Sequence, residues 1–198
     1  MPEILDPQSK RVVALIGLPG AGKGAVSTIL KGRGFRHIAT GDMVREEAVR
    51  RGVGIEERYK LHEIANAIQS EGGPEALAKM VIEKIRASVE NVWVVDGIRH
   101  PAQVAELKKK INALILGVTA SREMLTERIL GRKRTGDPKT PKEVSELLDR
   151  EWDSGIATYG IQVAQCMPMA DTIIENNGTL AELEEKVLAL CDTIDTSA

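Results

Sequence analysis

The sequence GLPGAGKG at residues 17–24 constrains this chain more than any other segment. An apolar run at residues 12–16 leads into it, and a segment that can be helical follows at residues 25–31. Glycines allow several backbone N–H groups to point into one small concavity. The N-terminus of the following helix adds a partial positive charge. The succession of strand, glycine loop and helix therefore predicts a site that binds a chain of phosphates.

Lys23 and the glycines before it match the P-loop pattern GxxxxGK[ST] at every position except the last. In that pattern the lysine reaches the terminal phosphates, and a serine or threonine, here replaced by Gly24, binds magnesium. A plain turn between a strand and a helix would require neither Lys23 nor glycines at these spacings. We expect the donor nucleotide to contact Gly17, Gly20, Ala21, Gly22, Lys23, Gly24 and Ala25.

The composition is that of a soluble globular protein, with 198 residues of which 42% are hydrophobic and 28% are charged. A formal charge of −2 gives no general attraction to nucleic acids or to anionic membranes. No segment approaches the length of a membrane span. The two cysteines, Cys166 and Cys191, have no metal-binding or redox spacing, which suits a reducing cytoplasm, although a disulfide between them stays open.

Apolar strands alternate with helical patterns along the chain, and this alternation predicts an α/β fold. We expect a five-stranded parallel sheet flanked by helices, because two of the strands are unbroken apolar runs of the kind buried on both faces. The expected strands are residues 11–16, 35–39, 92–95, 113–118 and 170–175. Three successive helices between the second and third strands predict an inserted helical lobe. One of these helices carries Leu77, Val81, Ile85 and Val89 at helical spacing.

Polar segments follow three of the predicted strands, at residues 17–24, 40–45 and 96–99. Ligands of open α/β sheets bind outside the carboxyl ends of the strands, so we expect these segments to face one crevice. Asp96 directly follows an apolar strand, which fits an aspartate that organises magnesium directly or through water. The alternative is an aspartate that caps a helix or forms a turn.

Four motifs together resemble those of the nucleoside monophosphate kinases, and of adenylate kinase most closely. They are the glycine loop, TGDMVR at residues 40–45, DGIRHPAQ at residues 96–103 and RILGR at residues 128–132. The resemblance runs from the first strand to the last helix. The family commonly has a glycine after the P-loop lysine, as at Gly24, and Mg2+ would then be held by phosphates and waters, with Asp42 and Asp96 beyond the waters.

The resemblance also implies residue roles. Thr40, Gly41 and Arg45 would contact the acceptor nucleotide, Arg99 would bind its phosphate, and Gln103 would read its base. Arg128 and Arg132 would grip ATP, and the later arginines of the family's lid correspond to Arg134 and Arg150. The implied organisation is one kinase domain over residues 1–198, with a core at 11–40, 91–128 and 141–198, an acceptor-binding lobe at 41–90 and a lid at 129–140.

The lid and the lobe depart from the family pattern. Only a short flap fits between Arg132 and Glu143, and the lobe differs in sequence after Arg51. The chain is therefore more similar to an adenylate-kinase-related branch known mainly from archaea, some of whose members are labelled dephospho-coenzyme A kinase-like.

The arginines assigned above to the acceptor, to ATP and to the lid also support phosphoryl transfer on physical grounds. A guanidinium group stays ionised and can bind two phosphate oxygens at once. There are more of these arginines than one triphosphate would need, which favours an acceptor that carries phosphate itself. The alternative is that Arg45, Arg128 and Arg150 form surface ion pairs with neighbouring acidic residues. A nucleic-acid patch at residues 132–134 is short and has no aromatic residues among it.

We therefore expect a cytoplasmic phosphotransferase that moves the γ-phosphoryl group of ATP to a small nucleotide acceptor, with AMP as the first candidate. Dephospho-coenzyme A and CMP are alternative acceptors. A nucleotide-binding switch or weak ATPase is the alternative of a different class, although Arg45, Arg99 and Gln103 would then have no evident task. The sequence does not indicate an oligomeric state.

Overall fold

The computed structural model describes residues 10–56, 58–133, 136–154 and 160–196. The described residues form a sheet of five parallel strands in the order β2-β3-β1-β4-β5. These strands are β1 (Arg11–Ile16), β2 (Arg36–Ala39), β3 (Val92–Asp96), β4 (Leu114–Thr119) and β5 (Thr172–Glu175). The prediction of an α/β fold with a five-stranded parallel sheet is confirmed. β1 lies between β3 and β4, so the order of the strands reverses beside it.

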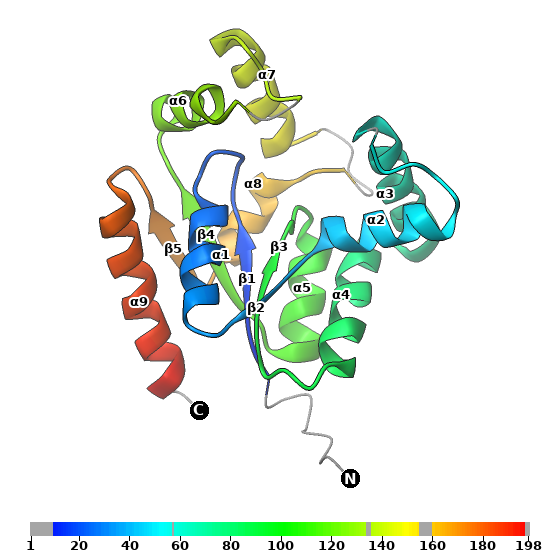
Figure 1. Ribbon diagram of the computed structural model, residues 1–198, viewed down its shortest axis with the longest axis horizontal. Coiled ribbons are helices and arrows are strands. Elements are labelled where there is room, and N and C mark those ends of the chain that lie inside the picture. The colour runs from blue at the N-terminus through cyan, green and yellow to red at the C-terminus, as the bar shows by residue number, and fades with distance from the viewer. Residues whose placement is uncertain (1–9, 57, 134–135, 155–159, 197–198) are drawn as a thin grey trace.

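Helices cover both faces of this sheet (Figure 1). Along the chain they are α1 (Lys23–Gly32), α2 (Thr40–Arg50), α3 (Arg58–Gly72), α4 (Ala76–Ala87), α5 (Pro101–Ile111), α6 (Arg122–Arg132), α7 (Pro141–Trp152), α8 (Val163–Cys166) and α9 (Leu180–Thr196). Figure 1 shows α1 and α9 on one side of the sheet and α4 and α5 on the other, with α6 and α7 beyond the carboxyl ends of the strands.

The alternating side chains of β1 face two different hydrophobic clusters. Val12, Ala14 and Ile16 face the cluster that includes α2, α3, α4 and α5. Val13 and Leu15 face the cluster that includes α1, α6, α7 and α9. Successive side chains of a strand point to opposite faces, so a strand buried on both faces reads as a continuous apolar run. The α4 helix shares its cluster with the sheet, and α2 and α3 pack into the same cluster.

The helix ends follow local rules that the sequence contains. The Thr140 side chain accepts a hydrogen bond from the Glu143 N–H (3.2 Å), and Glu143 accepts from the Thr140 N–H (3.3 Å), which forms a capping box at the start of α7. Ser121 caps α6 by accepting a hydrogen bond from the Met124 N–H. The prediction for Val89 is wrong, because α4 ends at Ala87 and Val89 is 84% exposed.

The segment between α7 and β5 contains structure that the sequence patterns did not predict. Residues 163–166 form the short helix α8, and a 3-10 turn, η2 (Met167–Met169), follows it. Cys166 lies in the cluster on the α5 side of the sheet, and Cys191 lies in the cluster on the α9 side. Both cysteines are buried and free, so the possible disulfide between them is not formed.

Within the described part of the chain, no helix combines the length and the apolar character needed to span a membrane.

Candidate functional site

The glycine loop at residues 17–22 connects the end of β1 to the start of α1. Gly17 and Gly22 both have positive φ angles, of +146° and +108°. A Cβ atom on Gly17 would lie 2.2 Å from the Val118 carbonyl oxygen, and one on Gly22 would lie 2.3 Å from the Asn176 Nδ2 atom. The loop is therefore closely packed against the ends of β4 and β5, and no side chain fits at these two positions.

Lys23 is the first residue of α1, and its side chain is half-buried beneath the loop. Its Nζ atom donates hydrogen bonds to the carbonyl oxygens of Gly17 (2.8 Å) and Leu18 (3.1 Å). Burial lowers the pKa of Lys23, because removal from water disfavours the ammonium form. The carboxylates of Asp96 and Glu151 act against this shift in pKa, whereas Arg99 and Arg132 add to it.

These electrostatic neighbours of Lys23 come from three separate parts of the chain. Asp96 ends β3, Arg99 follows it, and Arg132 ends α6. The structure thus brings together four residues that the sequence placed in the site, and adds Glu151, which the sequence analysis did not identify.

The segments after β2 and β3 are joined directly. The Thr40 hydroxyl donates a hydrogen bond to the Gly97 carbonyl oxygen (2.8 Å), and the Gly97 N–H donates to Asp96 Oδ1 (2.7 Å). Gly97 has a φ of +86°, and a Cβ atom there would lie 2.4 Å from the Thr40 hydroxyl oxygen. The glycine therefore allows the two strand ends to meet at the same edge as the glycine loop.

Asp42 and Arg45 form an ion pair in the first turns of α2. Asp42 Oδ1 accepts a hydrogen bond from the Arg45 guanidinium (2.5 Å), and Oδ2 accepts from the Ala39 N–H (2.8 Å). Gly41 lies beneath the Arg45 guanidinium, which is within 3.5 Å of the position of a Cβ atom. Both carboxylate oxygens of Asp42 therefore accept hydrogen bonds from groups at the start of α2.

Arg99 is held at three points by three different elements. Its N–H donates to the Oε1 atom of Gln103 on α5 (3.1 Å), and its carbonyl oxygen accepts from the Gln162 N–H just before α8 (2.7 Å). Its guanidinium forms a short hydrogen bond and ion pair with the carboxylate of Glu151 on α7. The Gln103 side chain is buried, with its oxygen turned to Arg99.

Glu151 is a buried acidic residue, only 4% exposed, on the otherwise apolar face of α7. It follows Val144, Leu147 and Leu148 at helical spacing and therefore lies on the buried face of the helix. An acidic residue in that register is the sequence signal that could have identified it.

Arg128 lies on the other side of the glycine loop from Arg99, at the segment after β5. Its guanidinium donates to the carbonyl oxygens of Asn176 (2.9 Å) and Gly178 (3.4 Å). The buried Asn176 side chain in turn donates to the Ala21 carbonyl oxygen (2.8 Å). Asn176 thus connects the Arg128 region to the glycine loop, and its place at the end of the last strand is the only sequence signal for that role.

The remaining arginines that were expected to contact the donor differ in their placement. Arg132 forms a two-pronged ion pair with Asp137, with hydrogen bonds of 2.6 and 2.8 Å. Arg134 lies outside the described residues. Arg150 is exposed on α7, and it points about 100° around the helix axis from its neighbour Glu151.

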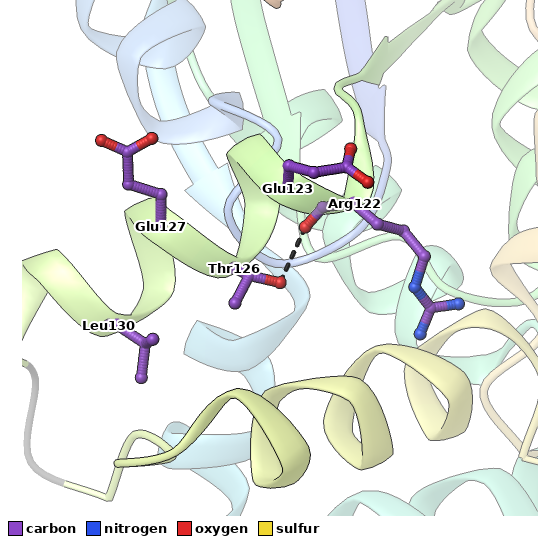
Figure 2. A pocket seen from close by; sticks show the side chains of 5 residues that line it. All are labelled: Arg122, Glu123, Thr126, Glu127 and Leu130. Atoms are coloured by element: carbon purple, nitrogen blue, oxygen red, sulfur yellow. Dashed lines mark hydrogen bonds between the residues drawn. The ribbon is translucent and has the colours of Figure 1, made fainter.

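A shallow surface hollow runs along α6, which packs beside α7. Figure 2 shows this hollow along α6, lined by Arg122, Glu123, Thr126, Glu127 and Leu130. The Thr126 hydroxyl bonds the Arg122 carbonyl oxygen, and the Arg122 guanidinium reaches Asp149 on α7 (2.8 Å). The Arg122 side chain thus serves the pairing of α6 with α7, and we assign the hollow no chemistry.

A magnesium ion bound by protein side chains alone is not supported. Among the described residues, no three His, Cys, Asp or Glu side chains lie close enough together to hold a metal ion. Asp96 ends β3 and Asp42 lies in the first turn of α2, and both are half-buried. A magnesium ion bound by one or two carboxylates takes its other ligands from phosphates and waters.

The arrangement suits a polyphosphate chemically. The glycine loop and the N-terminus of α1 lie at the carboxyl edge of the sheet, and Lys23, Arg99 and Arg132 bring positive charge to this edge from three segments of the chain. Such groups bind anionic oxygens and offset charge that develops on a transferred phosphoryl group.

Comparisons with known proteins agree with this architecture. A family model described as an AAA domain matches residues 16–146. A UPF0200 protein of Pyrococcus horikoshii is 33% identical over 181 residues, which cover 89% of this chain and 93% of the relative. A solved structure from Thermus thermophilus superposes with a TM-score of 0.64 at 15% identity, covering 93% of this chain and 97% of its own.

A shikimate kinase from Acinetobacter baumannii, solved in complex with shikimate, superposes with a TM-score of 0.58 at 17% identity, covering 94% of this chain and 95% of its own. At these identities the likeness to the solved structures shows a P-loop kinase-like fold. The family model and the curated relative go further, and they show that this chain belongs to the AAA-domain family and to the UPF0200 proteins.

Proposed function

We propose that this protein transfers the γ-phosphoryl group of ATP to a nucleoside monophosphate, with AMP as the first candidate acceptor. The observation that carries the proposal is the placement of Lys23 against a closely packed glycine loop, at the same sheet edge where Asp96 ends β3 and Arg99 pairs with Glu151. Two neighbouring strand ends, joined by the bond between Thr40 and Gly97, provide a second binding region beside it.

The donor nucleotide would lie along the glycine loop. The loop amides and Lys23 would hold its β and γ phosphates, and Nζ would then exchange its bonds to Gly17 and Leu18 for phosphate oxygens. Arg132 would contact the donor phosphates from α6. Arg128, placed beside the segment after β5, would contact the rest of the donor nucleotide.

The acceptor would lie across the ends of β2 and β3. Arg99 would hold its phosphate, Arg45 and Thr40 would contact it from α2, and Gln103 would orient Arg99 and approach the base. An oxygen of the acceptor phosphate would form a bond to the γ-phosphorus as the bond from that atom to the β-phosphate oxygen breaks, which leaves ADP. Positioning and charge supply most of the catalysis in such a transfer.

Magnesium would bind with the nucleotide and neutralise charge on its β and γ phosphates. Asp96, and Asp42 at the next strand end, would hold it through water. Arg134 and Arg150 would add charge when the lid closes over the donor. A closed lid would also exclude water, which otherwise competes as the acceptor.

The test is ADP formation with a panel of acceptors, ATP and magnesium. The panel includes AMP, CMP and dephospho-coenzyme A, as well as shikimate because of the structural neighbour that binds it. The Lys23→Ala variant is expected to lose at least about 100-fold in rate, and Lys31→Ala, which changes an exposed lysine on the same helix, is the matched control. Wild-type transfer by Lys23→Ala would falsify the assignment, and ATP hydrolysis that ignores every acceptor would favour a switch or ATPase.

A further inference from the structure

Glu151 is a buried carboxylate within a cluster of cations, and its partner is the arginine proposed to hold the acceptor phosphate. The Glu151 side chain is 6% exposed, whereas the Arg99 side chain is 42% exposed. A buried carboxylate is costly unless it is paired. The pair is therefore anchored at the glutamate end, and the guanidinium extends from it toward solvent.

The backbone of Arg99 is fixed as well as its side chain. Gln103 accepts from its N–H, and the Gln162 N–H donates to its carbonyl oxygen. A guanidinium has five N–H donors, and the structure records one of them, on Nη1, bound to Glu151. Arg99 can therefore keep its bond to Glu151 while its other donors bind a phosphate.

The pair also keeps the charge around Lys23 balanced. Arg99 lowers the pKa of Lys23 and Glu151 raises it, so the two charges oppose one another at the lysine. An arginine can thus stand near Lys23 with less of the repulsion that would favour loss of the lysine's proton.

We propose that Glu151 is a positioning residue, which holds the Arg99 guanidinium in the place where it meets the acceptor phosphate. The inference rests on the proposed function. It links α7, which follows the lid, to the acceptor side of the site, and neither the glycine loop nor the motif at residues 96–103 contains this link.

The test is a double-mutant cycle in the full-length protein with Glu151→Ala, Arg99→Ala and the double variant. Glu151→Ala is expected to lower kcat/KM for AMP by about 10- to 100-fold, because misplacing a positioning group by about 1 Å costs rate on that scale. KM for ATP should change less than about 3-fold. In the Arg99→Ala background, Glu151→Ala should change kcat/KM less than about 3-fold, because the residue that it positions is already absent.

Two further variants separate positioning from a general effect on the fold. Glu151→Gln keeps an oxygen that accepts from Nη1, and it should retain more than about one third of wild-type kcat/KM. Glu146→Ala changes an exposed glutamate on the same helix and should match the wild type. Melting temperatures of all variants report whether each is folded at the assay temperature.

Losses of kcat/KM that add in the double variant would overturn the inference. So would a Glu151→Gln variant that loses as much kcat/KM as Glu151→Ala, or a Glu151→Ala variant that is weakened equally toward ATP and AMP. If the wild-type protein forms no ADP with any acceptor, the proposed function fails, and the cycle is then read from dissociation constants of AMP and ATP by calorimetry. Coupling between Glu151 and Arg99 in AMP binding but not in ATP binding would still support the inference, and absence of AMP binding or of this coupling would reject it.

Discussion

Single residues of the glycine loop differ in how closely the structure surrounds them. Gly17 meets the backbone of β4, so a Cβ atom there has no room, and its φ is positive. Gly24, only seven positions later, is exposed on the first turn of α1, and a Cβ atom there would have no heavy atom within 4 Å. The sequence has glycine at both positions, yet only Gly17 is required by space.

We expect Gly17→Ala and Gly24→Ala to have opposite effects on stability. Gly17→Ala should lower the free energy of unfolding by about 2–4 kcal/mol, because the chain must both adopt a strained φ and displace a backbone carbonyl. Gly24→Ala should be neutral or raise it by up to about 1 kcal/mol, because alanine favours a helix more than glycine does. Urea unfolding monitored by circular dichroism measures both, and equal destabilisation by the two would contradict the close packing at Gly17.

The sequence predicted residues whose role follows from a local pattern and missed those whose role depends on a distant partner. Lys23 begins the helix after the glycine loop and Asp96 ends a strand, and a local pattern can locate both positions. Glu151 meets Arg99 from 52 positions away, and Asn176 meets Ala21 from 155 positions away. Such pairs depend on how α7 and β5 pack, which no single stretch of sequence contains.

At the scale of elements, α7 connects the predicted lid to Arg99, the residue proposed to hold the acceptor phosphate. The helix begins at the capping box of Thr140 and Glu143, and its buried face ends at Glu151. Arg122 on α6 pairs with Asp149, so the two helices are also connected on their exposed side. The stability of the first turn of α7 therefore contributes to the position of Glu151.

We expect Thr140→Ala to loosen α7 from its N-terminus. Loss of the side-chain cap costs about 1 kcal/mol, which corresponds to roughly fivefold faster amide hydrogen exchange in the helix where exchange follows its local opening. Thr140→Ser retains the hydroxyl and should exchange like the wild type, and Lys142→Ala, an exposed change in the same turn, is a second control. Exchange in α7 that is unchanged by Thr140→Ala would show that packing alone fixes the helix.

Elements with strong local signals could be predicted, and those formed by packing could not. Capping boxes and apolar runs predicted α7 and β3, because these signals act within a few residues. The short α8 and η2 have no such pattern, and their buried residues are fixed by contact with the core under α5. The end of α4 was misplaced for the opposite reason, because helical spacing continued to Val89 although the chain turns after Ala87 toward β3.

At the scale of the whole molecule, the Lys23 charge that suits the candidate site lowers the stability of the ligand-free fold. Burial lowers the pKa of Lys23, which means that folding without a ligand disfavours its charged form. This cost in stability is fully present when the pH is below the folded-state pKa of Lys23, and it falls as the pH rises from there to the ordinary lysine pKa of 10.5. A bound polyphosphate would supply the counter-charge and remove the cost.

We therefore expect Lys23→Met to reverse the order of stability between the free and the ATP-bound protein. Without ligand, Lys23→Met should melt above the wild type at pH 7, because a buried ammonium is replaced by an apolar side chain of similar length. With magnesium and ATP at about 100 times its Kd, the wild type should gain about 2.7 kcal/mol, or roughly 5–10 °C in Tm for a protein of this size. Lys23→Met should gain almost nothing, and differential scanning fluorimetry measures both.

The pH dependence identifies the buried charge as the cause of this reversal. The Tm difference between ligand-free Lys23→Met and the wild type should narrow as pH rises toward 10.5, because lysine is then neutral in both the folded and the unfolded chain. A gain in packing from methionine would instead give a difference that pH does not change. A ligand-free variant that melts below the wild type at pH 7 would show that the bonds from Nζ to Gly17 and Leu18 outweigh the cost of burying the charge.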